Sequence, residues 1–131
     1  MKIHHVGYLI KNMENTIEEM ISWGGILIRE SIYDHARQVD IAFVKNGEML
    51  IELVCPRAES RDVGDSLKRL GNTPYHICYE CDDIDAAIIR LQAEGCLLVK
   101  EPQSAVAIGG RRVAFLYSDN QGLFEILENG T

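Results

Sequence analysis

Apolar and polar residues alternate along the first stretch of the chain, Ile3–Ile10, and this period of two predicts a β-strand with one buried face. After Asn12 the apolar residues recur every three or four positions, which predicts a helix from about Met13 to Trp23. Asn12 can accept hydrogen bonds from the first free N–H groups of this helix, and Gly24–Gly25 suits a left-handed C-terminal cap. The expected buried stripe of the helix consists of Ile17, Met20 and Ile21.

The same series of signals occurs again in the second half of the chain. The strand histidine, the residue before the helix and the glycine after it align as His5 with His76, Asn12 with Asp83, and Gly24 with Gly95. Each copy continues with a similar strand and then an apolar strand with a central glutamate: DIAFV (Asp40–Val44) and Glu52, then RVAFL (Arg112–Leu116) and Glu125. The second helix is expected to bury Ile84, Ala87, Ile88 and Leu91. This duplication predicts two copies of a unit made of a strand, a helix and a run of strands.

The 131 residues are enough for one domain with a substantial core, and we expect both copies to belong to it. Module one is expected to cover about residues 1–57, and module two about residues 73–131. The polar segment between them, about 58–72, is interpreted as a connector with a short helix near Asp65–Leu70.

The net charge of −7, from 20 acidic and 13 basic residues, argues against nucleic acid or an anionic membrane as the main partner. No apolar run approaches the ~20 residues that span a bilayer, and the N-terminus does not resemble a signal peptide. We therefore expect a cytoplasmic protein with reduced cysteines that acts on a small molecule.

The segment YHICYECDD, Tyr75–Asp83, combines a histidine with a C-x-x-C spacing, which raises the alternative of a thiol or zinc site. In a strand, Cys78 and Cys81 point to opposite faces, so they do not readily close on one metal or on each other. The sequence has no second cysteine pair with similar spacing. We therefore interpret Cys81 as a packing residue on the helix side, and Cys78 as a neighbour of His76 that could line a pocket.

If the last strand of each copy lies beside the first, each copy projects one imidazole and one carboxylate onto the same face of its sheet. Glu52 and Glu125 stand in otherwise apolar runs, where an unpaired carboxylate is costly to bury. Two copies facing each other would bring together two nitrogen and two oxygen ligands, a set that suits a divalent metal. The four residues are His5, Glu52, His76 and Glu125. A single strand histidine or glutamate is more often structural, but the recurrence at matched offsets favours the metal.

These motifs resemble the vicinal oxygen chelate superfamily, which includes glyoxalase I and the bleomycin resistance proteins. The resemblance is carried by HVGYLI, IEL, HICYECDDIDAA, GRRVAFL and LFEILE, and it covers essentially the whole chain. It implies an α+β fold in which two paired βαβββ modules form a cupped, mostly antiparallel sheet around a metal, often in a homodimer. The family's ligand positions match His5, Glu52, His76 and Glu125, and the ion could be zinc, cobalt, nickel, manganese or iron.

Within the superfamily, the segments YHICYECDDIDAA, GRRVAFL and SLKRLGNTPYH are most similar to those of methylmalonyl-CoA epimerases. The resemblance implies a metal-dependent isomerase or lyase that stabilises the enolate of a substrate chelated through two oxygens. The favoured reaction is a 1,1-proton transfer on a 2-substituted acyl thioester, so the substrate could be an acyl-CoA. Glu52 and Glu125 are the candidate bases. Lower-ranked substrate contacts, each of which could equally be a surface or packing residue, are Asp40, Cys78, Glu80, Arg111 and Arg112.

Two alternatives remain open beside the epimerase. One is a lyase like glyoxalase I, and the other is a non-catalytic small-molecule binding or resistance protein of the same fold. Such binders usually lack the metal residues, whereas this chain has all four. A ring-cleaving dioxygenase is less favoured because its iron site uses two histidines and one carboxylate, which would leave Glu52 without a role.

Overall fold

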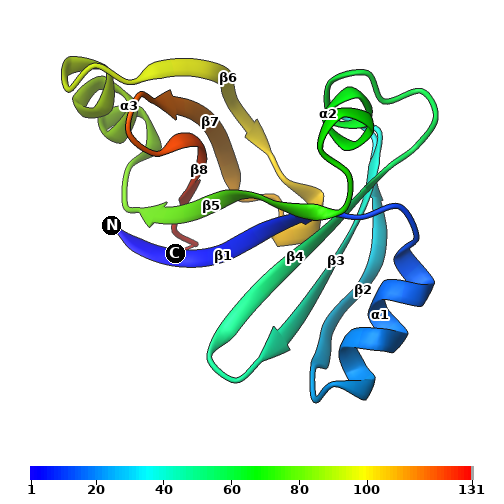
Figure 1. Cartoon of the computed structure of the whole chain (residues 1–131). Coiled ribbons are helices and arrows are strands. Elements are labelled where there is room, and N and C mark those ends of the chain that lie inside the picture. Colours follow the sequence, from blue (N-terminus) through cyan, green and yellow to red (C-terminus); the bar gives the residue numbers. More distant parts are fainter. Residues whose placement is uncertain (131) are drawn as a thin grey trace. The chain divides into compact units, whose positions relative to one another are not determined.

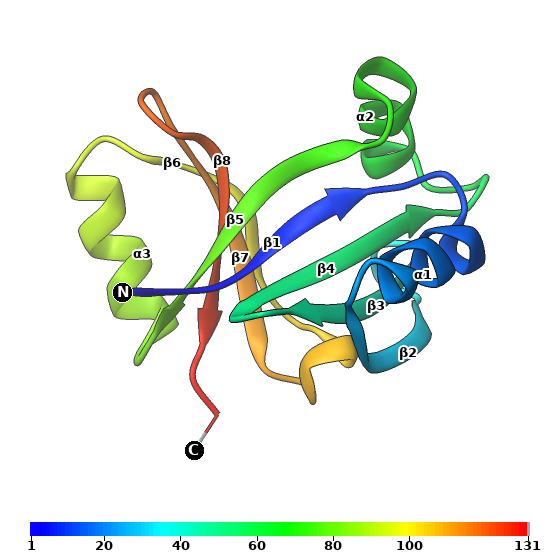
Figure 2. The ribbon, with the colours of Figure 1, turned by 60° about the horizontal axis from the view of Figure 1, so that its bottom comes forward.

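The computed structural model describes residues 1–130 and divides into two compact units. The N-terminal unit is His5–Tyr75, and the C-terminal unit is the chain from His76 on together with Met1–His4. One βαβββ arrangement belongs to each half of the chain (Figures 1 and 2), which confirms the α+β fold class and the repeat.

The N-terminal unit contains a sheet, a helix packed on it and a helix in the connector. In chain order these elements are β1 (Lys2–Leu9), α1 (Met13–Ser22), β2 (Ile26–Asp34), β3 (Val39–Asn46), β4 (Met49–Pro56) and α2 (Asp62–Leu70). The strand order is β2-β3-β4-β1, in which β3 is antiparallel to β2 and β4, and β4 is parallel to β1. Side chains of α1 pack against a buried cluster on one face of the sheet, formed by Ile10, Ala42, Val44 and Leu53.

The C-terminal unit repeats this plan. Its elements are β5 (Thr73–Cys81), α3 (Ile84–Ala93), β6 (Leu97–Ser104), the short 3₁₀ helix η1 (Val106–Ile108), β7 (Arg112–Ser118) and β8 (Gly122–Glu128). The strand order is β5-β8-β7-β6, with β5 parallel to β8 and the other pairs antiparallel. The buried residues of α3 are the four that the sequence predicts, and they pack on Cys81, Ala114, Leu116, Phe124 and Ile126.

Both helices begin and end as predicted. The Asn15 N–H donates to Asn12 Oδ1 at 2.9 Å, and the Ala86 N–H donates to Asp83 Oδ1 at 3.1 Å. Each side chain therefore satisfies one of the N–H groups that a helix start leaves without an intrahelical partner. Both helices are followed by a glycine with positive φ, Gly24 at 102° and Gly95 at 100°.

Two details of the prediction are wrong. Ile21 does not belong to the buried stripe of α1, since 45% of it is exposed. At 3.6 residues per turn it lies about 80° around the helix from Met13, at the margin of the stripe that Met13, Ile17 and Met20 form. The connector helix is also longer than expected, because α2 starts at Asp62 and not near Asp65.

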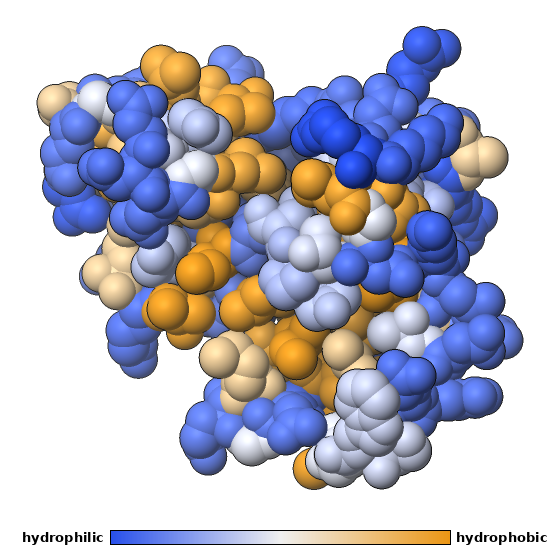
Figure 3. Space-filling view, in the orientation of Figure 1, coloured by the Kyte–Doolittle hydropathy of each residue, from blue (hydrophilic) through white to orange (hydrophobic). Residues whose placement is uncertain are grey.

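Polar residues cover much of the face of the molecule in Figure 3, with apolar patches between them. Each edge strand contributes apolar side chains that reach the solvent, namely Ile26 and Ile28 on β2 and Leu97 and Val99 on β6. Within residues 1–130, no helix has the length and the apolar character that a membrane crossing needs.

Candidate functional site

One histidine and one glutamate lie together in the N-terminal unit, on neighbouring parallel strands. Glu52 in β4 is the register partner of Gly7 in β1, so His5, two residues earlier, lies on the same face of the sheet as Glu52. His5 Nε2 is 3.6 Å from Glu52 Oε1. Both residues are buried, with exposed fractions of 0% and 5%.

The C-terminal unit contains the equivalent pair. Glu125 in β8 is the register partner of Cys78 in β5, and His76 again precedes that partner by two residues. His76 Nε2 is 3.3 Å from Glu125 Oε1, and the exposed fractions are 4% and 3%. The first and last strands of each module are therefore neighbours, which is the condition on which the sequence argument for a metal site depends, and their register is the same in both modules.

Each of these pairs also has a phenylalanine beside it. The ring centroid of Phe43 lies 5.4 Å from that of His5, with an angle of 80° between the ring planes. Phe115 and His76 make the same edge-to-face contact, at 5.2 Å and 87°. No role for these rings is predicted above, although their recurrence in DIAFV and RVAFL is the sequence signal that identifies them.

The chemistry and spacing of each pair fit the ligands of a divalent metal. Nitrogen and oxygen ligands bind zinc at about 2.0–2.2 Å, so two ligands of one ion that are about 90–109° apart are separated by about 3.0–3.5 Å. The two N–O distances of the chain, 3.6 and 3.3 Å, are close to this range. The burial of both carboxylates is also compatible with a metal site, because buried charged groups in proteins are paired or bind metals. All four residues are buried and of types that could serve as ligands.

The lower-ranked candidate Asp40 forms an ion pair in the N-terminal unit. Asp40 lies three positions from Phe43 in β3, and therefore on the opposite face of the sheet. Its carboxylate accepts hydrogen bonds from Arg57 Nη2 at 2.9 Å and Arg57 Nε at 3.2 Å. The guanidinium of Arg57 also lies 3.9 Å from the ring centre of Tyr33, and the bond to Asp40 raises the pKa of Arg57. The structure thus places Asp40 away from the His5–Glu52 pair.

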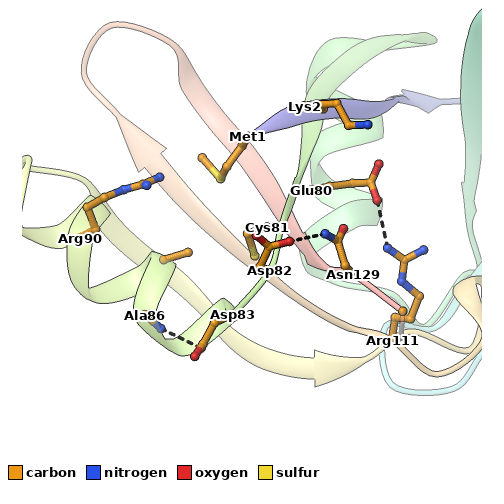
Figure 4. A pocket seen from close by; sticks show the side chains of 12 residues that line it. Met1, Lys2, Glu80, Cys81, Asp82, Asp83, Ala86, Arg90, Arg111 and Asn129 are labelled. Atoms are coloured by element: carbon orange, nitrogen blue, oxygen red, sulfur yellow. Dashed lines mark hydrogen bonds and ion pairs between the residues drawn. The ribbon is translucent and has the colours of Figure 1, made fainter.

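Glu80 and Arg111 lie at a cavity of about 830 Å³ in the C-terminal unit (Figure 4). Arg111 Nη2 is 3.3 Å from Glu80 Oε2, and Arg111 Nε donates to the carbonyl oxygen of Glu128. The other side chains at the cavity include Lys2, Arg90, Asp82 and Asp83. His76 and Glu125 do not line this cavity. The cavity therefore does not join Glu80 and Arg111 to the histidine–glutamate pair.

Arg112 connects β7 to the start of α3. Its Nη2 lies 3.0 Å from Glu128 Oε2 and 3.2 Å from Asp85 Oδ2. Glu128 Oε2 also accepts a hydrogen bond from the Ile84 N–H at 3.0 Å. The hydrogen bond from Arg112 lowers the pKa of Glu128. In this structure Arg112 therefore stabilises the N-terminus of α3.

The cysteines separate as the strand pattern predicts. Cys81 packs with the buried residues of α3, and burial raises the pKa of its thiol. Cys78 is fully buried on the other face, in a cluster with Ala105, Val113 and Leu127. It is Cys81, and not Cys78, that reaches the cavity of Figure 4. No disulfide joins any of the four cysteines, all of which lie within residues 1–130.

Comparison with known proteins agrees with the resemblance seen in the sequence. The chain is 28% identical over 130 residues to the mitochondrial methylmalonyl-CoA epimerase of Dictyostelium discoideum, which covers 97% of this chain and 78% of that protein. The methylmalonyl-CoA epimerase of Mycobacterium tuberculosis has the same fold, with a TM-score of 0.86 and 23% identity over 99% of this chain and 89% of that one.

A Streptomyces coelicolor methylmalonyl-CoA epimerase in complex with 2-nitronate-propionyl-CoA is similarly close in fold, with a TM-score of 0.85 and 22% identity over 100% of this chain and 96% of that one. The sequence profile of the glyoxalase/bleomycin resistance protein/dioxygenase superfamily matches residues 4–115. With the duplicated module and its two buried histidine–glutamate pairs, this match shows that the chain belongs to the glyoxalase/bleomycin resistance protein/dioxygenase superfamily.

Proposed function

We propose that this protein is a metal-dependent epimerase that acts on a 2-substituted acyl thioester such as methylmalonyl-CoA. One divalent ion would take its protein ligands from both pairs, namely His5, Glu52, His76 and Glu125. The observation that carries the proposal is the occurrence of the same buried pair in both units, with the same strand register and similar N–O distances.

A divalent ion held by these four residues would supply a Lewis acid that stabilises negative charge on the substrate. The protein must then move a proton. One of the two carboxylates, Glu52 or Glu125, accepts the proton of the carbon beside the carbonyl on a carboxylate oxygen, and the C–H electron pair passes into the enolate of the substrate. The other carboxyl group, in its protonated form, then donates a proton to the opposite face of the planar enolate, whose electron pair re-forms the C–H bond. This inverts the configuration of that carbon and leaves the two carboxyl groups with exchanged protonation states.

Burial of both glutamates supports this role. Both residues are nearly inaccessible to bulk water, with exposed fractions of 5% for Glu52 and 3% for Glu125. The hydrophobic surroundings, which include Phe43 and Phe115, also keep water from protonating the enolate at random.

The acyl-CoA substrate class is supported by the names of the relatives and by the ligand of the Streptomyces coelicolor protein. A binding role for Arg111 or Arg112 stays a prediction, and in this structure both guanidinium groups have protein partners. The homodimer and the cytoplasmic location also stay predictions from the sequence.

The test combines metal analysis with an exchange assay. The purified protein is analysed for bound metal and then incubated with methylmalonyl-CoA in D₂O, and deuterium at the α-carbon is followed by mass spectrometry. We expect about one divalent ion per chain and incorporation that stops when the ion is removed by a chelator. A protein that binds metal without incorporating deuterium would disprove the epimerase, and a parallel assay with the hemithioacetal of methylglyoxal and glutathione would then test the lyase.

A further inference from the structure

Phe43 and Phe115 occupy equivalent positions in the two modules. Phe43 is the register partner of Glu52 across β3 and β4, and Phe115 is the register partner of Glu125 across β7 and β8. Residues paired in this way lie side by side on one face of a sheet, with Cβ atoms about 4.5–5.5 Å apart. Each phenyl ring therefore stands next to the glutamate of its pair and also contacts the histidine edge-to-face.

An aromatic neighbour of this kind can restrict the orientation of an imidazole. The last side-chain torsion of histidine has broad, roughly two-fold minima, and rotation about it moves Nε2 out of the direction in which it can bind a ligand. An aromatic ring packed edge-to-face favours one orientation, and centroid separations of about 4.5–7 Å are typical of this contact. The separations of 5.4 and 5.2 Å lie within that range.

The chain contains an internal comparison for these two phenyl rings. The chain has three phenylalanines, and two of them contact the candidate ligand histidines. Phe43 is buried and Phe115 is partly buried. The third, Phe124, is buried as well, but it lies on the other face of β8, where its ring contacts Tyr79 and packs with α3. Phe124 thus provides a matched example of a phenyl ring that only fills the core.

We propose that Phe43 and Phe115 are positioning residues, which hold the imidazoles of His5 and His76 so that Nε2 is presented to a divalent cation. The inference rests on the proposed metal site and adds two residues to it. Neither ring binds the cation itself.

The experiment compares Phe43→Leu and Phe115→Leu with the core control Phe124→Leu and with Phe115→Tyr, which keeps the ring. Two quantities are measured on each full-length protein. The first is the affinity for Co²⁺, by competition with a chromogenic chelator and from the visible spectrum of the bound ion. The second is the NMR signals of the histidine ring protons in the metal-free protein.

We expect each of the two site variants to bind Co²⁺ between about threefold and tenfold more weakly than the wild type, which is the range of an aromatic pair contact. Phe124→Leu should lower the melting temperature without changing the affinity for Co²⁺. Phe115→Tyr, which keeps the aromatic ring, should bind Co²⁺ as tightly as the wild type. In the metal-free protein Phe43→Leu should displace the His5 ring signals and leave those of His76 in place, and Phe115→Leu should do the reverse.

Equal affinities for Phe115→Leu and Phe124→Leu would overturn the positioning role, and so would ring signals that move alike in all three leucine variants. Failure of the wild type to bind Co²⁺ is a different result, since it would refute the proposed metal site. The ring signals would then decide the positioning role by themselves, because they are recorded without metal.

Discussion

Replacement of Glu125 by glutamine tests the candidate metal site with little change in side-chain size. Glu125 Oε1 lies 3.3 Å from His76 Nε2, and only 3% of the residue is exposed. Because bulk water has little access to this position, it cannot easily replace the lost carboxylate as a ligand. We therefore expect Glu125→Gln to bind metal much more weakly and to lose deuterium exchange into the substrate.

The size of the effect follows from the number of ligands. A complete structural zinc site binds with about 10–16 kcal/mol at pH 7, which is about 2.5–4 kcal/mol for each of four ligands. A loss of that size corresponds to an affinity about 60- to 700-fold lower. The amide oxygen of glutamine remains a weak neutral ligand, so we expect a loss near the lower end, about 100-fold.

The affinity is measured by competition with a zinc chelator at fixed pH, on Glu125→Gln and two companion variants. Glu52→Gln should show a loss within about threefold of the first, because its pair has the same strand register. Glu128→Gln is the control. Its carboxylate lies three residues further along β8 and bonds to Arg112, so the metal affinity should not change. The reasoning is refuted if Glu125→Gln loses no more affinity than Glu128→Gln.

Three further predictions concern stability and the choice of base. Arg112 lowers the pKa of Glu128, so this carboxylate stabilises the fold above its ordinary pKa of 4.5, and the stabilisation is lost as the pH falls through the lowered value. The wild type should therefore melt at a higher temperature than Glu128→Gln at about pH 7, and this difference should become smaller as the pH is lowered to about pH 3. A difference that grows as the pH falls would contradict the stabilising role of the Glu128 carboxylate. Gly25→Ala should lower the free energy of unfolding in urea by about 1–3 kcal/mol, because its Cβ would lie 2.8 Å from a backbone oxygen of α1. Gly64→Ala in α2, with its nearest atom at 4.0 Å, should be neutral or stabilising, so equal losses would disprove the steric reason. Asp40→Asn should leave deuterium exchange unchanged, and a clear loss of exchange would identify Asp40 as a base despite its ion pair.

The parts of the fold that could be predicted are those where a local pattern occurs twice. The alternation in β1, the caps of α1 and α3 and the apolar strands around Glu52 and Glu125 depend only on residues close in sequence. The sequence argument also assumed that the first and last strands of each copy are neighbours, and the parallel pairs β1–β4 and β5–β8 satisfy this assumption. This was enough to place each histidine next to its glutamate.

The parts that could not be predicted depend on register or on distant partners. In β2 the register shifts on both sides of Arg29, and in β6 it shifts on both sides of Lys100, so neither edge strand has a clean alternation. The partner of Arg112 was also hidden, because Glu128 is 16 residues away and bonds to the start of α3 as well. A pair of neighbouring arginines in a sequence does not reveal whether a carboxylate of the protein already binds them.

The position of the candidate ligands follows from the same alternation that builds the core. In β8 the residues Phe124 and Ile126 are buried under α3, so Glu125 between them must point to the other face of the sheet. A shift of β8 by one residue would bring Glu125 under the helix and expose the two apolar side chains, and both changes are unfavourable. The core therefore holds the ligand in register without any strained backbone at Glu125. Since β4 places Glu52 by the same alternation, duplication of one strand–helix–strand unit is sufficient to supply the same buried histidine–glutamate pair twice.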